Sequence, residues 1–137
     1  MKSDLPKVMH KVAGRPMVDW SIELARNVGC DRIVVIGHPS QQVLIDHVGA
    51  SLGSDSLAYQ DPPLGTGHAV RCAEDALAGF EGDLVVLYGD SPLVPASAIE
   101  SLFDSLGDGA AIGVLGFDAA EPGLYGRHIT SGQGDLE

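Results

Sequence analysis

A short stretch after the most apolar run of the sequence has the composition of a site for a metal ion that carries phosphates. The run of residues 84–87 is followed by Tyr88, Gly89 and Asp90. Glycine lets a ligand approach the backbone, and the hard carboxylate oxygens of Asp90 suit Mg²⁺ bound to substrate phosphates. The alternative is that Asp90 only caps the turn before Pro92. The position of Asp90 at the end of a buried strand favours the metal site.

A second stretch, from Gln60 to Ala69, places Gly65, Thr66 and Gly67 at the expected start of a helix. Unpaired backbone N–H groups and a hydroxyl can there recognise the edge of a base or an anion. The spacing matches neither a Walker A loop nor GxGxxG. By itself the stretch therefore favours a simple helix start over a nucleotide contact. His68, in the first helical turn, is predicted to be a hydrogen-bonded packing residue rather than a base or metal ligand.

The third stretch is residues 3–7, near the beginning of the sequence. Pro6 holds the backbone in an extended turn, and Lys7 offers a compact cation of the kind that binds phosphate oxygens. Lys11 and Arg15 lie close in sequence and add positive charge to an otherwise acidic chain. The alternative is that Lys7 is a solvated surface lysine. The local concentration of positive charge indicates an anionic ligand.

The composition predicts a single globular domain and excludes several classes of protein. The chain has 137 residues, of which 45% are hydrophobic, and its net charge is −11. Such a charge repels nucleic acid and anionic membranes. No apolar run could span a membrane and no signal peptide is evident, so we expect a cytoplasmic location. Cys30 and Cys72 form no CxxC pair and are expected to be reduced thiols without a chemical role.

The spacing of apolar residues alternates along the chain between the helical and the strand pattern, and so predicts the elements that position these stretches. Helices are expected over residues 17–28, 41–48, 67–77 and 97–106, and strands over 32–37, 57–60, 83–88 and 110–117. The β-branched strand at 32–37 should be buried on both faces, as in a parallel sheet, and Ser40 should cap the helix that follows. The alternation predicts an α/β fold with an open, mostly parallel sheet and helices on both faces. A ligand would then lie outside the carboxyl ends of the strands, where the first two stretches fall.

Four motifs occur in order along nearly the whole chain. Residues 1–17 resemble a family segment MxSDLPKVLHxxAGxPM, residues 63–69 resemble QLGTGHA, residues 87–93 resemble LYGDxPL, and residues 123–127 resemble GYGR. Together they resemble the uridylyltransferase domain of the bifunctional bacterial N-acetylglucosamine-1-phosphate uridylyltransferase/glucosamine-1-phosphate acetyltransferase family. The combination favours this family over its thymidylyl-, guanylyl- and cytidylyltransferase relatives.

The resemblance implies a Rossmann-like sugar nucleotidyltransferase. Such an enzyme joins UTP and N-acetylglucosamine 1-phosphate to give UDP-N-acetylglucosamine and pyrophosphate, with Mg²⁺, for peptidoglycan and lipopolysaccharide synthesis. By this resemblance Lys7 would bind the nucleotide phosphates and Asp90 would bind Mg²⁺, and both would serve catalysis. Further contacts are implied as follows: uracil would be read by Gln60, Gly65 and Thr66, the nucleotide site would be lined by Tyr88 and Gly89, and the sugar would contact Gly126.

The resemblance also implies that residues 1–137 are a partial nucleotidyltransferase domain. The family's LAAGxGTRM loop precedes SDLPK, so its glycines and the first strand of the sheet are expected to be missing. Losing that interior strand would expose two hydrogen-bonding edges. The family's sugar-binding asparagines, its second Mg²⁺ ligand and the β-helix acetyltransferase domain, which makes the family trimeric, would also be absent. A homo-oligomer is a further expectation.

Three hypotheses follow from these observations. The chain is a piece of a uridylyltransferase domain, a nucleotide-binding remnant that is inactive or is completed by another chain, or a different enzyme of the same fold with another base or sugar. Because the phosphate loop and a metal ligand are expected to be missing, the 137-residue chain by itself is predicted to have little or no turnover.

Overall fold

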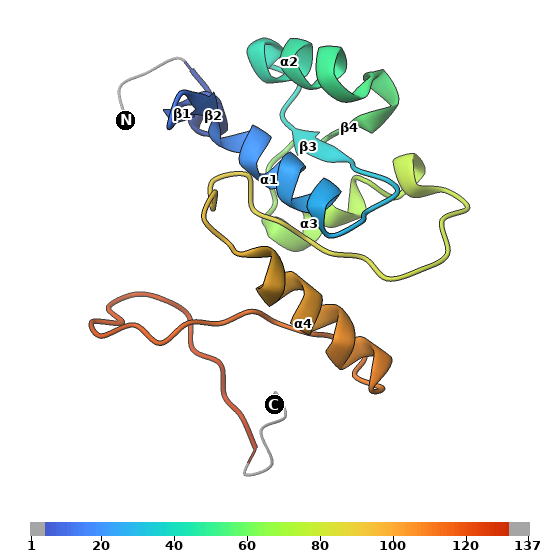
Figure 1. The fold of residues 1–137 in the computed structure, drawn as a ribbon. Coiled ribbons are helices and arrows are strands. Elements are labelled where there is room, and N and C mark those ends of the chain that lie inside the picture. Colours follow the sequence, from blue (N-terminus) through green and yellow to red (C-terminus); the bar gives the residue numbers. More distant parts are fainter. Residues whose placement is uncertain (1–4, 132–137) are drawn as a thin grey trace. The chain divides into compact units, whose positions relative to one another are not determined.

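The computed structural model describes residues 5–131, which divide into two units with a boundary between Glu100 and Ser101. Of the elements in the described residues, strands β1 to β4 and helices α1 to α3 belong to the first unit (Figure 1). The last helix, α4 (Ala96–Gly107), contains the boundary. The helix predicted over residues 97–106 is thereby confirmed.

A tight hairpin follows a single 3₁₀ turn, η1 (Lys7–Met9), near the start of the first unit. Strand β1 (Lys11–Val12) pairs in antiparallel fashion with β2 (Arg15–Pro16). The two turn residues, Ala13 and Gly14, have φ angles of 49° and 83°. Positive φ at both central positions belongs to the turn type whose twist matches that of paired strands. The hairpin therefore returns the chain directly into the first α-helix.

The first α-helix, α1 (Met17–Asn27), confirms the helix predicted over residues 17–28. It is followed by a parallel βαβ unit built from β3 (Val35–Gly37), α2 (Gln42–Leu52) and β4 (Leu57–Tyr59). The strands β3 and β4 run side by side along α2 (Figure 1). The parallel pairing predicted from the β-branched run is therefore confirmed.

The hydrophobic core of the first unit lies between α1 and α2. Its buried side chains come from η1 and the two helices: Met9, Val18, Ile22, Leu44 and Val48. Asp19 of α1 and His47 of α2 add a polar contact, with 2.6 Å between Oδ1 and Nε2. Apolar side chains on both helices and this hydrogen bond between them fix how α1 meets α2.

We expect the substitution Leu44→Ala to lower the free energy of unfolding by about 2–5 kcal/mol, because it removes a core side chain and leaves a cavity. Leu44 is only 2% exposed. Val43 is its neighbour on α2 but is 50% exposed, so Val43→Ala should change stability by about 0.5 kcal/mol at most. Urea denaturation of the two variants checks this, and equal losses would contradict the assigned core.

The helices predicted over residues 67–77 and 41–48 differ in length or capping from those observed. The helix predicted over residues 67–77 is split into α3 (Thr66–Arg71) and a 3₁₀ turn, η3 (Asp75–Leu77). Another 3₁₀ turn, η2 (Ser54–Ser56), connects α2 to β4. Ser40 does not cap α2, because its hydroxyl lies 2.7 Å from His38 Nδ1 and Gln41 takes the N-cap position.

The two strands predicted over residues 83–88 and 110–117 are not formed. In the first, Leu84 and Val86 are about half exposed, which also contradicts the expectation of a buried strand. An apolar run becomes a strand only when a neighbouring strand pairs with its backbone. Among residues 5–131 the sheets contain only β1 to β4, so neither run has such a neighbour.

The fold is mixed α/β, with one two-stranded parallel sheet and one two-stranded antiparallel sheet in the described part of the chain. The open sheet with helices on both faces, expected from the alternation of elements, is not confirmed. Strand β3 has only β4 beside it in the described chain, so it is partly rather than fully buried. Within residues 5–131, the helices are all too short or too polar to cross a membrane.

Candidate functional site

The structure brings the first and third sequence stretches together at an ion pair. Lys7 Nζ lies 2.7 Å from Asp90 Oδ2, although the two residues are 83 positions apart in the sequence. Their side chains are 65% and 35% exposed. An ion pair this open to water adds little stability. It holds a cation and a carboxylate side by side at the surface, where each can take a new partner.

Two contacts hold the turn at residues 88–90 against the start of the chain. A Cβ atom added to Gly89 would meet Val8 Cγ1 at 3.1 Å, so glycine permits the close approach. The carbonyl of Tyr88 accepts a hydrogen bond of 3.1 Å from the hydroxyl of Ser21 on α1. The same carbonyl accepts a bond from the backbone N–H of Ser91, which closes the turn. Tyr88, Gly89 and Asp90 are thus positioned next to Lys7.

Sequence reasoning missed both supporting residues. Val8 lies in the SDLPKV segment but carries no polar group that would mark it. Ser21 gives a weak signal, because it is a polar residue among the buried positions of α1.

Of the third stretch, residues 3 and 4 lie outside the described part of the chain, as do residues 132–137.

The second stretch folds around the side chain of Gln60, directly after β4. The backbone N–H of Gln60 donates to Gly37 O at 2.8 Å and so links the ends of β4 and β3. Its side-chain Nε2 lies 2.8 Å from Gly65 O and 3.1 Å from His68 Nδ1. Gly65 has φ of 100°, a value that favours glycine, and Thr66 begins α3. Gln60 therefore lies next to Gly65 and Thr66 at the start of α3. The prediction that His68 is hydrogen-bonded is confirmed.

The positive charge expected from Arg15 is not available beside Lys7. The guanidinium of Arg15 forms an ion pair with Glu23 and lies 4.7 Å from the centre of the Trp20 ring. Trp20 in turn donates from Nε1 to Val12 O at 3.1 Å. Arg15 thus fastens the hairpin to α1. Among residues 5–131, the cation that contacts Asp90 is Lys7.

Asp90 fits the kind of metal site that the sequence indicates. Within residues 5–131, no group of three or more His, Cys, Asp and Glu side chains could hold a metal ion. Mg²⁺ commonly keeps several waters and is bound by one or two carboxylates together with substrate phosphates. An accessible single carboxylate such as Asp90 suits an ion that arrives with its phosphates. The role of Asp90 as a metal ligand stays a prediction.

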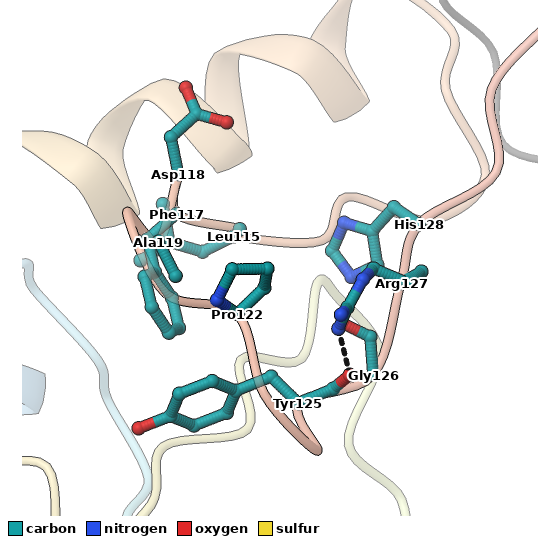
Figure 2. A pocket seen from close by; sticks show the side chains of 10 residues that line it. Leu115, Phe117, Asp118, Ala119, Pro122, Tyr125, Gly126, Arg127 and His128 are labelled. Carbon is teal, nitrogen blue, oxygen red and sulfur yellow. Dashed lines mark hydrogen bonds between the residues drawn. The ribbon is translucent and has the colours of Figure 1, made fainter.

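Gly126, the residue expected to contact a sugar, lies in the second unit. It lines a cavity of about 520 Å³ together with aromatic and basic side chains (Figure 2). Phe117 and Tyr125 meet edge to face with 5.3 Å between ring centres. The guanidinium of Arg127 donates to the carbonyls of Tyr125 and Gly123, and so braces the loop that carries Gly126. The sugar contact itself stays a prediction.

Both cysteines are free thiols, as the sequence predicts. Burial raises the pKa of the Cys30 thiol, and the neighbouring carboxylate of Asp31 raises it further. A raised pKa lowers the thiolate fraction at neutral pH, and the thiolate is the reactive form. Cys30 is therefore a poor nucleophile, which agrees with the expectation that it has no chemical role.

We expect Cys30 to react with iodoacetamide more slowly than a small exposed thiol at neutral pH, with a rate that rises into alkaline pH. The substitution Asp31→Asn removes the nearby negative charge and should speed the reaction and shift its pH midpoint downward. Mass spectrometry of the Cys30 peptide follows the modification. An unchanged or higher midpoint in Asp31→Asn would refute the electrostatic part of this account.

Comparison with known proteins identifies relatives over nearly the whole chain. Residues 1–132 match the MobA-like NTP transferase domain. The proteins named "Bifunctional protein GlmU" from Hyphomonas neptunium and Maricaulis maris are 68% and 47% identical over 137 residues, which is 100% of this chain and 30% of each relative. That from Caulobacter vibrioides is 52% identical over 130 residues, or 94% of this chain and 28% of the relative. The chain thus spans about 30% of the length of the curated relatives it matches. Because the family match extends over residues 1–132, the chain belongs to the MobA-like NTP transferase domain family.

Proposed function

We propose that this chain forms the nucleotide-binding part of a uridylyltransferase site that transfers UMP from UTP to N-acetylglucosamine 1-phosphate. The products are UDP-N-acetylglucosamine and pyrophosphate. The observation that carries the proposal is the surface pair of Lys7 and Asp90, with 2.7 Å between Nζ and Oδ2. Family membership and the four sequence motifs support it.

The pair has the two charges that such a reaction needs. When a nucleotide binds, the ammonium of Lys7 exchanges the carboxylate of Asp90 for phosphate oxygens. Asp90 is then free to hold Mg²⁺ through its carboxylate. The metal ion supplies positive charge that offsets the charge of the phosphates. In the chain without ligand, Asp90 therefore keeps the phosphate-binding cation in place.

The chemistry requires no nucleophile from the protein. An oxygen of the sugar phosphate attacks the α-phosphorus of UTP in line, a new P–O bond forms, and the bond to the pyrophosphate group breaks with its electron pair leaving on pyrophosphate. The side chains contribute positioning and charge neutralisation. Gln60, Gly65 and Thr66 hold the base, Tyr88 and Gly89 line the nucleotide site, and Gly126 contacts the sugar.

The biological setting is part of the same proposal. UDP-N-acetylglucosamine is an activated sugar for peptidoglycan and lipopolysaccharide synthesis, and a cytoplasmic location would supply the UTP. The net charge of −11 argues against a nucleic-acid partner. Association with further copies of the chain also belongs to the proposal, and light scattering would measure it.

Titration calorimetry of the 137-residue chain with UTP and Mg²⁺ tests nucleotide binding. We expect heat of binding with UTP and weaker binding with CTP, GTP and dTTP. Absence of any UTP binding would contradict the proposal. Turnover is measured as pyrophosphate release in a chain extended at both ends with the flanking sequence of the Hyphomonas relative. Pyrophosphate release with another sugar phosphate, but not with N-acetylglucosamine 1-phosphate, would show that the proposed sugar substrate is wrong.

A further inference from the structure

We propose that His68 is a positioning residue that fixes the side-chain amide of Gln60, and that the fixed amide selects uracil over cytosine. The inference rests on the proposed role of Gln60 as a reader of the base. Two distances carry it: Gln60 Nε2 lies 2.8 Å from Gly65 O and 3.1 Å from His68 Nδ1.

The carbonyl of Gly65 decides which way the amide of Gln60 points. The oxygen and nitrogen of a glutamine amide are distinguished by their hydrogen-bond partners. A backbone carbonyl only accepts, so the atom 2.8 Å from Gly65 O must be the nitrogen. The reverse orientation would place two acceptor oxygens against each other at that distance.

The ring of His68 accepts a hydrogen bond from the second N–H of the same amide nitrogen. Because Nε2 of Gln60 donates, Nδ1 of His68 must be the unprotonated, accepting nitrogen. The other ring nitrogen then carries the hydrogen, and it lies 3.7 Å from Cys72 Sγ, a weak acceptor. Gly65, His68 and Cys72 thus form a consistent chain of partners around Gln60.

This arrangement uses both N–H groups of the Gln60 side chain. The carbonyl oxygen Oε1 is left as the group that can meet a ligand, and the partially exposed side chain allows it. Uracil presents an N–H donor at N3, whereas cytosine presents an acceptor at the same position. An oxygen held in place pairs with the first and repels the second, and rotation of the amide would cost the bonds to Gly65 and His68.

The first experiment reads the tautomer of His68 directly in the 137-residue chain, without any ligand. A long-range ¹H–¹⁵N correlation spectrum, recorded where the ring is neutral, is expected to show the hydrogen on Nε2 and none on Nδ1. His68→Asn identifies the signals of this ring. A hydrogen on Nδ1 would overturn the inference, whatever the chain binds.

The second experiment compares UTP with CTP in two variants. In His68→Asn, Oδ1 is as many bonds from the backbone as Nδ1 and still accepts from Gln60, so the ratio of the two affinities should stay near that of the unaltered chain. In His68→Leu the acceptor is lost, and the ratio should fall by about fivefold, as expected for one hydrogen bond.

The outcomes of the two experiments separate the inference from the proposed function. If UTP binds preferentially and His68→Leu keeps the full preference, His68 does not position the amide and the inference is wrong. A common loss of affinity for both nucleotides in His68→Leu and His68→Asn would also overturn it, because a general packing role would act in that way. If the unaltered chain binds no nucleotide, the proposed function fails, and with it the selection of the base.

Discussion

Asp90→Asn weakens the binding of UTP when Mg²⁺ is present but leaves it equal or tighter when the metal is chelated. The substitution removes the carboxylate that would hold the metal, while it keeps the size of the side chain. Without metal, the same change removes a negative charge that repels the triphosphate and releases Lys7 from its ion pair. The two conditions should therefore shift the affinity in opposite directions. Calorimetry with UTP, in Mg²⁺ and in a chelator, measures both.

In the chain extended at both ends, Asp90→Asn should lower pyrophosphate release by about a hundredfold or more, since bound metal contributes several kcal/mol of charge stabilisation to such transfers. Asp83→Asn is the matched control, because Asp83 is an exposed carboxylate in the same segment. It should behave like the unaltered chain. An equal loss in both variants, or an Asp90→Asn chain that keeps its response to Mg²⁺, would rule out Asp90 as the metal ligand.

Lys7→Gln lowers the affinity for UTP by about 10- to 100-fold, in the presence and in the absence of Mg²⁺. A hydrogen bond from a charged group to a phosphate contributes about 1.5–3 kcal/mol, and glutamine retains a donor but not the charge. The affinity of the unaltered chain should also fall with added salt more steeply than that of Lys7→Gln. Calorimetry at two salt concentrations measures the loss and the slope.

Lys11→Gln is the control for this substitution, because Lys11 is an exposed lysine on β1 close to Lys7 in the sequence. It should change the affinity by about twofold at most, since a screened charge at a distance contributes little. The stability of Lys7→Gln should match that of the unaltered chain, because the ion pair is open to solvent. Equal effects of the two lysines would mean that the chain attracts nucleotides only by general charge.

Sequence reasoning predicted helices better than strands, and the reason is physical. The helix predicted at residues 17–28 is formed at 17–27, because a helix satisfies its backbone within one segment. A strand depends on a neighbour that may be distant in the sequence. Residues 35–37 have such a neighbour, because they pair with residues 57–59. Residues 83–88 are just as apolar, yet in the described chain no strand pairs with them.

The candidate site divides in the same way. The sequence and the resemblance predicted roles for Lys7, Gln60 and Asp90 in binding phosphate, base and metal, and these roles stay predictions; side-chain chemistry and local spacing are properties of the sequence. Val8 and Ser21, which support the turn at residues 88–90, have no comparable signal. Their roles arise from packing between segments that the sequence does not show to be neighbours.

The sequence by itself determined the family, the kinds of side chain available for chemistry and the helices whose apolar period is local. Only the tertiary structure decided that Lys7 reaches Asp90 and that the amide of Gln60 is held between Gly65 and His68. The difference has one cause: side-chain identity is fixed residue by residue, whereas a hydrogen bond between distant residues exists only after packing has brought them together.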